Sequence, residues 1–200
     1  MQHLSHYFSI AAFAVLIPAW IVFLGLFVLG RKPAAAPDSK RAPQSFAGLA
    51  LQAVAVGIVW MFYRVPFLSP LVEGQFLLNI ALALLAVILV VGAIIFAHSA
   101  VKELGKQFAL RARLIEGHEL ITTGVYGIVR HPIYTAFFAM MLATGLVLSH
   151  WLALIAATCL FLFGTRIRTA SEDRLLSDAF GEVFLKWKEK VPALIPFVRY

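Results

Sequence analysis

Apolar residues in this 200-residue chain are grouped into four long runs that contain no Asp, Glu, Lys or Arg. The runs cover residues 8–29, 46–63, 76–97 and 132–165. A helix that crosses a bilayer needs about 20 apolar residues, and each of the first three runs is close to that length. The pattern therefore predicts membrane-spanning helices and excludes a soluble globular domain.

The fourth run is too long for one membrane crossing. As a single helix its 34 residues would extend about 51 Å, whereas the hydrocarbon core is about 30 Å thick. We expect two short helices joined by a tight turn at Ser149 and His150, a polar pair near its middle. The predicted fold class is an all-α integral membrane protein with about five transmembrane helices, the last two forming a short helical hairpin.

The C-terminal tail carries an apolar stripe at helical spacing, which predicts an amphipathic helix along the membrane interface. Pro192 is expected to end this helix. The lysines at positions 186, 188 and 190 are expected to form a solvated run. The stripe consists of Leu175, Leu176, Ala179, Phe180, Val183, Phe184 and Trp187.

The net charge of +7 is explained by membrane topology rather than by nucleic-acid binding, because the basic residues flank the apolar runs. With five spans, 16 of the 17 Lys and Arg residues fall on one side of the membrane and Arg64 alone falls on the other. The positive-inside rule then predicts an external N-terminus and a cytoplasmic tail. Polar chemistry is expected at the cytoplasmic face, since the spans contain no charged residue.

The densest polar segment precedes the fourth run, at residues 118–134. Pro132 suits the first turn of a helix, which would place Arg130 and His131 at a helix N-terminus, where backbone N–H groups favour an anion. Gly124 and Gly127 allow the backbone to turn tightly. The residues alone leave two interpretations open. Arg130 and His131 either belong to a ligand site, or Arg130 binds lipid headgroups while His131 caps the helix.

Other chemistries lack their motifs. The chain has no Gly-x-Gly-x-x-Gly string, so a Rossmann nucleotide site is not predicted. The single cysteine, Cys159, and the scattered histidines have no metal-binding spacing, so we predict no metal site.

The segment Gly124-x-Tyr126-x-x-x-Arg130-His131-Pro132-x-Tyr134 resembles a signature of the isoprenylcysteine carboxyl methyltransferase family and its phospholipid methyltransferase relatives. The tail strings Glu172-Asp173, Phe180-Gly181, Val191-Pro192 and Ile195-Pro196 resemble further landmarks of that family. The resemblance covers residues 101–197 and includes no signature in the first two spans. Asp173 stands where the family has a second Glu, and Phe184 and Trp187 stand where tyrosines are usual.

The resemblance implies an integral membrane enzyme that uses S-adenosylmethionine without a Rossmann domain. It implies that His131 holds the carboxylate of the cofactor, that Glu172 meets its ammonium or ribose, and that Tyr126 and Tyr134 wall its adenine or sulfonium. Arg168, one helical turn before Glu172, is the candidate for orienting an acceptor carboxylate, and we take Arg168 and Glu172 as catalytic candidates. The candidate cofactor-binding residues are His118, Leu120, Gly124, Tyr126, Arg130, His131, Tyr134, Glu172 and Asp173.

The function implied is methyl transfer to a lipophilic acceptor, with the carboxylate of an isoprenylcysteine-like molecule favoured. A phospholipid amine, a small thiol, or a non-catalytic role as a membrane scaffold stay open as alternatives. The expected partners are the bilayer and the lipophilic acceptor, without nucleic acid, and no oligomeric state is predicted. We expect one membrane domain, in which residues 1–100 form three transmembrane helices and residues 101–200 form the cofactor-binding loop, the hairpin and the tail.

Overall fold

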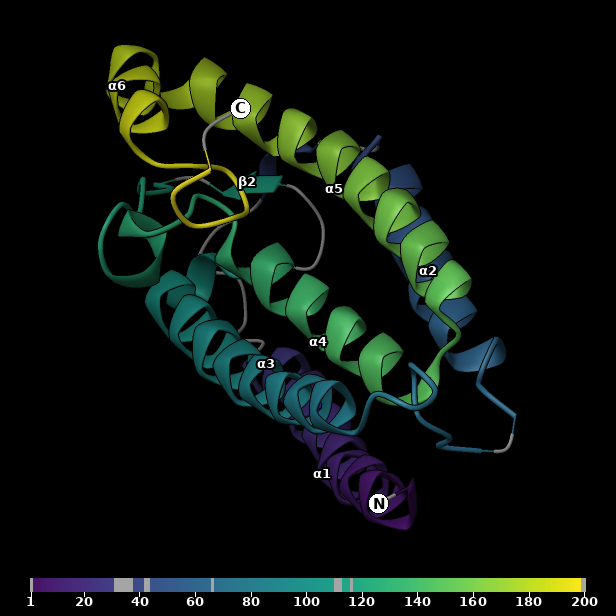
Figure 1. The fold of residues 1–200 in the computed structure, drawn as a ribbon. Coiled ribbons are helices and arrows are strands. Elements are labelled where there is room, and N and C mark those ends of the chain that lie inside the picture. The colour runs from purple at the N-terminus through teal and green to yellow at the C-terminus, as the bar shows by residue number, and fades with distance from the viewer. Residues whose placement is uncertain are drawn as a thin grey trace.

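The computed structural model describes residues 2–30, 38–41, 44–65, 67–109, 113–115 and 117–198, which are mostly helical (Figure 1). Two short antiparallel strands, which the sequence did not predict, pair in the loops before α2 and after α3. The elements are α1 (Gln2–Leu29), β1 (Asp38–Arg41), α2 (Ser45–Met61), α3 (Phe76–Leu104), η1 (Gly105–Gln107), β2 (Arg113–Ile115), η2 (Gly124–Gly127), α4 (Pro132–Leu148), α5 (Trp151–Phe180) and α6 (Glu182–Lys190).

The five predicted apolar helices are all present. Three segments are long and apolar enough to cross a membrane, namely His6–Leu29, Phe76–Gln107 and Trp151–Phe180. The other two, α2 and α4, have 17 residues each, or about 26 Å of helix. That α2 and α4 also cross the bilayer stays a prediction. The division of the chain into residues 1–100 and 101–200 also stays a prediction, and α3 continues across this boundary to Leu104.

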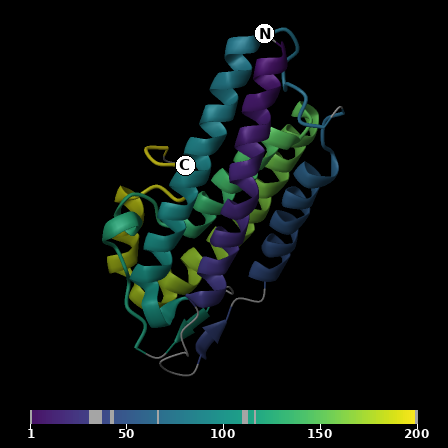
Figure 2. The same ribbon diagram turned by 90° about the horizontal axis from the view of Figure 1, so that it is seen from below.

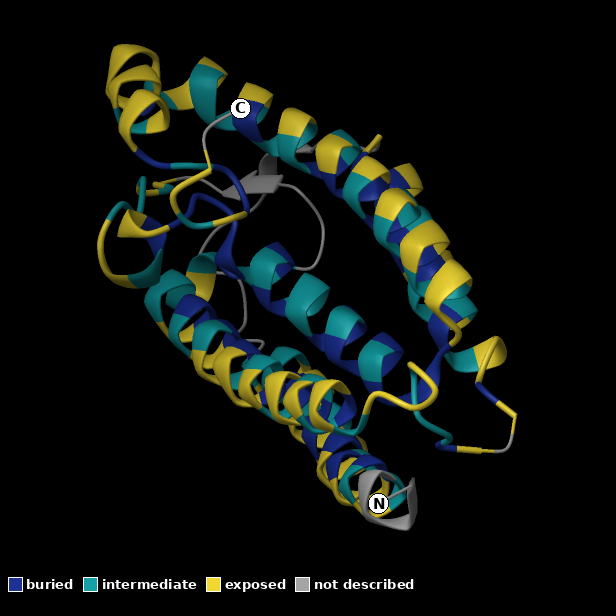
Figure 3. Cartoon of the chain, viewed as in Figure 1, coloured by how far each residue is buried: buried dark blue, intermediate teal, exposed yellow. Residues whose placement is uncertain are grey.

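Helix α4 lies at the centre of the bundle (Figure 1). It packs against α3 and α1 on one side and against α5 and α2 on the other, and α1 lies beside α3 in both ribbon views (Figures 1 and 2). Met140 and Met141, neighbours in α4, are both fully buried and belong to the two different core clusters. The outer faces of α1, α3 and α5 are exposed, whereas α4 is buried or half-buried (Figure 3).

The turn at Ser149 and His150 divides the fourth apolar run as predicted, since α4 ends at Leu148 and α5 begins at Trp151. The expectation of two short helices is wrong for the second one, because α5 has 30 residues. The prediction of a single helix in the tail is also wrong. Gly181, with a left-handed φ of +50°, ends α5 and begins α6, so the expected apolar stripe is shared between two helices.

Helices α2 and α5 approach each other so closely that glycine is required at two facing positions. A Cβ atom on Gly164 would lie 2.7 Å from the carbonyl oxygen of Gly48, and one on Gly48 would lie 2.6 Å from Cγ of Arg168. Small residues allow this close packing of backbones in membrane helix pairs. The glycine pair therefore determines the distance between α2 and α5.

Replacing Gly164 with Ala is expected to destabilise the protein by about 1–3 kcal/mol, the usual cost of overpacking a filled interface. The matched control is Gly57→Ala on α2, where an added Cβ meets no atom within 4 Å. The measurement is thermal unfolding of the detergent-solubilised protein. Equal melting temperatures for the two variants would contradict this account of the α2–α5 contact.

Candidate active site

A cavity of about 560 Å³ lies at the end of the bundle where η2, α6 and the start of α4 gather. This volume lies within the range of about 300–1,000 Å³ that is typical of small-molecule sites. Most of the residues that line it are apolar, and they come from every α-helix of the fold and from the loop before η2. The predicted site residues among them are His118, Leu120, Tyr126, Arg130, His131, Tyr134, Arg168 and Glu172.

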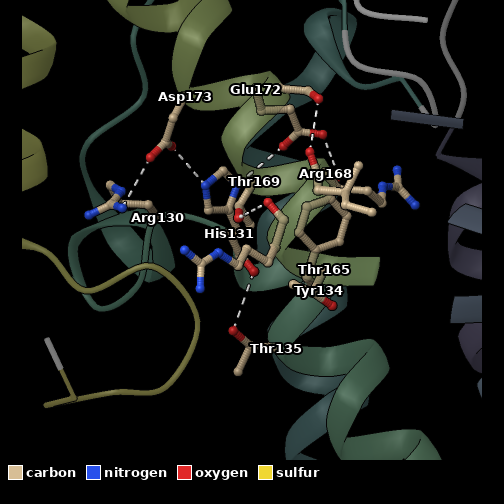
Figure 4. Close-up of polar contacts among 12 residues, drawn as sticks. Arg130, His131, Tyr134, Thr135, Thr165, Arg168, Thr169, Glu172 and Asp173 are labelled. Atoms are coloured by element: carbon tan, nitrogen blue, oxygen red, sulfur yellow. Dashed lines mark hydrogen bonds and ion pairs between the residues drawn. The ribbon is translucent and has the colours of Figure 1, made fainter. Parts of the chain in front are cut away.

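Asp173, which does not line the cavity, is the centre of an ion cluster beside it, in which Asp173, Arg130 and His131 are buried (Figure 4). Its Oδ2 atom lies 3.2 Å from Nη2 of Arg130 and 3.0 Å from Nζ of Lys188, and its Oδ1 atom lies 3.0 Å from Nε2 of His131. The cluster joins α5 to the start of α4 and to α6. Lys188 is exposed, at 44% of its side chain, as expected for the solvated run, and its ammonium group also pairs with Asp173.

Arg130 binds the tail of the chain rather than a lipid headgroup. It is buried, and its Nη1 donates to the carbonyl oxygens of Val191, at 2.6 Å, and of Lys188, at 3.0 Å. The backbone N–H groups of Arg130 and His131 donate to the carbonyls of Pro192 and Ala193, at 2.8 and 3.0 Å. These two N–H groups, expected to favour an anionic ligand, therefore hold the tail against the start of α4.

His131 lies between two carboxylates. Its Nδ1 is 3.2 Å from Oε2 of Glu172 and its Nε2 is 3.0 Å from Oδ1 of Asp173. Burial lowers the pKa of His131, but the hydrogen bonds and negative charges of Asp173 and Glu172 outweigh burial and raise it above the usual 6.5. A protonated ring donates to both carboxylates, so His131 orients Glu172. Both ring nitrogens are occupied by these contacts, so neither is directed at the carboxylate of a ligand, which the resemblance had implied.

Glu172 and Arg168 present opposite charges to the same cavity, as expected from their spacing on α5. Tyr134 connects them, because its hydroxyl donates to Oε1 of Glu172 and its ring centre lies 4.5 Å from the guanidinium carbon of Arg168 (Figure 4). The resemblance implied that the ring of Tyr134 contacts the sulfonium of a bound cofactor. In the structure the cation beside this ring is the guanidinium of Arg168. The cavity wall therefore carries a positioned carboxylate and a positioned guanidinium.

Several buried nitrogen atoms on residues that line the cavity have no hydrogen-bond partner among the described residues. They include Nδ1 of His118, Nε of Arg130 and Nε1 of Trp187. Burial lowers the pKa of His118, which favours its neutral form. An unpaired buried polar atom costs about 1–3 kcal/mol, so a ligand that pairs these atoms gains affinity. The sequence did not identify Trp187 as a site residue, although it stands in place of a family tyrosine.

Tyr126 and Gly124 belong to η2, which closes the cavity near the end of α3. Burial raises the pKa of Tyr126, as do the charges of Glu172 and Glu103, so its phenol stays neutral near neutral pH. A Cβ atom on Gly124 would overlap the carboxylate of Glu103, whose Oε1 accepts from the N–H of Val125 at 3.4 Å. Gly124, which does not line the cavity, positions η2 by allowing this contact.

A model of the isoprenylcysteine carboxyl methyltransferase (ICMT) family matches residues 77–178, which is just over half of the chain. The chain belongs to this family. The matched region contains α3, α4 and most of α5, including the cluster residues from Arg130 to Asp173. The first two helices and α6 lie outside it.

Curated proteins named protein-S-isoprenylcysteine O-methyltransferase are similar to up to half of the chain. Protein-S-isoprenylcysteine O-methyltransferase of Schizosaccharomyces pombe is 31% identical over 103 residues, covering 50% of this chain and 43% of the relative. The Arabidopsis thaliana protein-S-isoprenylcysteine O-methyltransferase B is 31% identical over 96 residues, covering 47% and 49%. For the Homo sapiens enzyme the identity is 33% over 82 residues, covering 41% and 29%. The matches thus span less than half the length of these relatives.

The fold is similar to that of a solved structure of the eukaryotic intramembrane Ras methyltransferase ICMT. The TM-score is 0.51 at 23% identity, and the similarity covers 80% of this chain and 54% of that chain. At this identity the likeness concerns the fold alone. With its long apolar helices, this ICMT-family chain is a multi-pass integral membrane protein.

The charge on His131 predicts a pH dependence of stability. Because its pKa is raised on folding, its ion pairs contribute fully below pH 6.5 and are lost as the pH rises through the raised value. We expect the melting temperature of the wild type to fall across that interval, and the His131→Gln variant to be less stable at pH 6 and to lack this part of the fall. Parallel profiles for the two proteins would contradict the assignment of a charged His131.

Proposed function

We propose that this ICMT-family protein is an S-adenosylmethionine-dependent methyltransferase that esterifies the carboxylate of a lipophilic, isoprenylcysteine-like acceptor. The observation that carries the proposal is the pairing of Glu172 and Arg168, which line one cavity from adjacent turns of α5 and are joined through Tyr134. Relatives named protein-S-isoprenylcysteine O-methyltransferase support the choice of acceptor.

The residues around the cavity suit the cofactor. Glu172 is partly exposed, at 24% of its side chain, and offers a carboxylate to the ammonium group or to ribose hydroxyls. The unpaired nitrogens of His118 and Trp187 suit the polar edge of an adenine, and Leu120 and Tyr126 supply apolar surface beside it. When bound, S-adenosylmethionine supplies a methyl group activated on a positively charged sulfur, and its transfer to a carboxylate yields a methyl ester without general-base catalysis.

The apolar part of the cavity suits the lipid portion of the acceptor. Phe23 and Phe27 of α1, Leu49 of α2 and Phe137 of α4 line it, and all three helices are apolar. Burial of such a chain gains about 25 cal/mol for each Å² of apolar surface removed from water. Arg168 would bind the carboxylate at the head of that chain and align it, and the apolar walls would exclude water from the reaction.

We propose that the cavity opens on the cytoplasmic side. The basic residues around it support this orientation under the positive-inside rule. Arg64, the single basic residue assigned to the other side, donates to the carbonyls of Val147 at 2.6 Å and Ser149 at 2.5 Å. Burial lowers its pKa to about 10. A buried Arg64 that binds the C-terminal end of α4 is a structural contact, so it does not oppose this topology.

Cofactor binding is the first test. Glu172→Gln is expected to weaken the affinity for S-adenosylmethionine roughly 10- to 100-fold, because a hydrogen bond to a charged group contributes about 1.5–3 kcal/mol. Trp187→Phe, which removes the indole N–H and keeps an aromatic ring, is expected to weaken it less. Isothermal titration in detergent measures both, with Glu182→Gln on the exposed face of α6 as the control. Wild-type protein that binds no cofactor at millimolar concentration would overturn the proposal.

Acceptor class is the second test. Arg168→Lys is expected to keep cofactor affinity and lose most turnover, because an ammonium group cannot grip a carboxylate in a bidentate plane. The assay is methyl transfer from labelled cofactor to a prenylcysteine carboxylate and, separately, to a phosphatidylethanolamine analogue. Full activity of the variant on the carboxylate acceptor would contradict the proposal that Arg168 binds and aligns this carboxylate. Turnover of the amine alone would assign the protein to phospholipid methylation.

A further inference from the structure

Gln52 is the single polar side chain between residues 46 and 59 of α2. It is fully buried, and its two side-chain hydrogen-bond partners among the described residues belong to α5. Its Nε2 donates to Oγ1 of Thr165 at 2.8 Å, and its Oε1 accepts from Nη1 of Arg168 at 3.1 Å. Polar side chains within membrane helices are energetically expensive and are found mostly where they have a function. Helix α2 lies outside the part of the chain that the family model matches, so that match assigns Gln52 no role.

The hydrogen bonds determine which way the amide of Gln52 points. The hydroxyl of Thr165 donates to the carbonyl oxygen of Phe161 at 2.8 Å, so its oxygen accepts from the amide nitrogen of Gln52. The amide oxygen is thereby directed toward Arg168, whose guanidinium can only donate. The acceptor offered to Arg168 is thus held in one orientation by two helices.

Helix α2 also provides the space that the side chain of Arg168 occupies. Gly48 lies one turn before Gln52, and a Cβ atom there would come within 2.6 Å of Cγ of Arg168. From α4, the ring of Tyr134 lies 4.5 Å from the guanidinium carbon. Arg168 therefore extends from α5 along the backbone of α2, and its charged end is held by groups of α2 and α4.

We propose that Gln52 is a positioning residue that orients the guanidinium of Arg168 toward the acceptor carboxylate. A bidentate grip on a carboxylate depends on the plane of the guanidinium, and the hydrogen bond from Nη1 to Gln52 restricts rotation of that plane. Helix α2 is then part of the acceptor site, through Gly48, Leu49 and Gln52, although it carries no family signature. The inference rests on the proposed function, since it requires an anionic acceptor bound by Arg168.

The experiment uses the purified 200-residue chain in detergent, with labelled S-adenosylmethionine and N-acetyl-S-farnesylcysteine as the carboxylate acceptor. Gln52→Leu removes the oriented oxygen and is expected to lower kcat/KM for this acceptor roughly 10- to 100-fold, because a small misplacement of a positioning group has effects of that size. Its affinity for S-adenosylmethionine should stay within about threefold of the wild type, because a mutation at an independent site changes the binding free energy only slightly. Val59→Ala, a buried change on the same helix, is the control and should leave kcat/KM unchanged.

A second variant keeps the test decisive if Gln52→Leu does not fold. Gln52→Glu has almost the same shape, and its carboxylate would compete with the acceptor for Arg168. We expect its KM for the carboxylate to rise roughly tenfold or more, because correctly placed charge pairs at a binding site have effects of this order, while cofactor affinity is retained. A role of Gln52 in packing alone would not produce this selective change. A wild-type KM for Gln52→Glu would overturn the inference.

A double-mutant cycle separates positioning from a general effect on the bundle. In an Arg168→Lys background, Gln52→Leu should cost less than about threefold in kcat/KM, because two residues that act as a unit are not additive. Additive losses would overturn the inference and leave the proposed function intact. If the wild-type protein methylates no carboxylate acceptor, the proposed function fails, and the inference fails with it.

Discussion

The carboxylate of Asp173 holds together the end of the molecule where the cavity lies. Arg130 precedes α4 and Lys188 lies in α6, so Asp173 in α5 binds one cation that comes before it in the sequence and one that comes after it. Loss of one partner from a buried ion pair, such as that of Arg130 with Asp173, is strongly destabilising, by about 3–5 kcal/mol, because the charge that is left is neither paired nor hydrated. The position of α6, and with it the place of Trp187 on the cavity wall, depends on this carboxylate.

Asp173 also governs the neighbouring glutamate indirectly. Its hydrogen bond to one nitrogen of His131 favours the protonated ring, and the other nitrogen then donates to Glu172. The two adjacent acidic residues thus have different tasks. Asp173 organises the polypeptide, whereas Glu172, which is nearer to the cavity, is available for a ligand. The shorter side chain of Asp173 keeps its carboxylate close to α5 and within reach of all three cations.

The membrane bundle supports this polar end by a close contact between α2 and α5. Gly48 and Gly164 bring α2 and α5 together, and Gln52 can reach Thr165 and Arg168 only because the two backbones are so close. A helix pair in lipid gains little from the hydrophobic effect, so close packing and buried hydrogen bonds supply its stability. The same contacts that hold α2 in the bundle therefore place the guanidinium on the cavity wall.

The sequence by itself determined the apolar helices, the turn at Ser149 and His150, and the candidate residues that gather at one end. These features depend on local composition and on spacing along one helix, which a sequence displays directly. The tertiary structure decided what each polar group contacts. Arg130 binds the tail, Lys188 is paired, and α5 continues past the apolar run to Gly181. Only the tertiary structure showed that Gln52 and Trp187 belong to the site. Contacts between residues more than 100 positions apart, such as that of Gln52 with Arg168, depend on how whole helices pack.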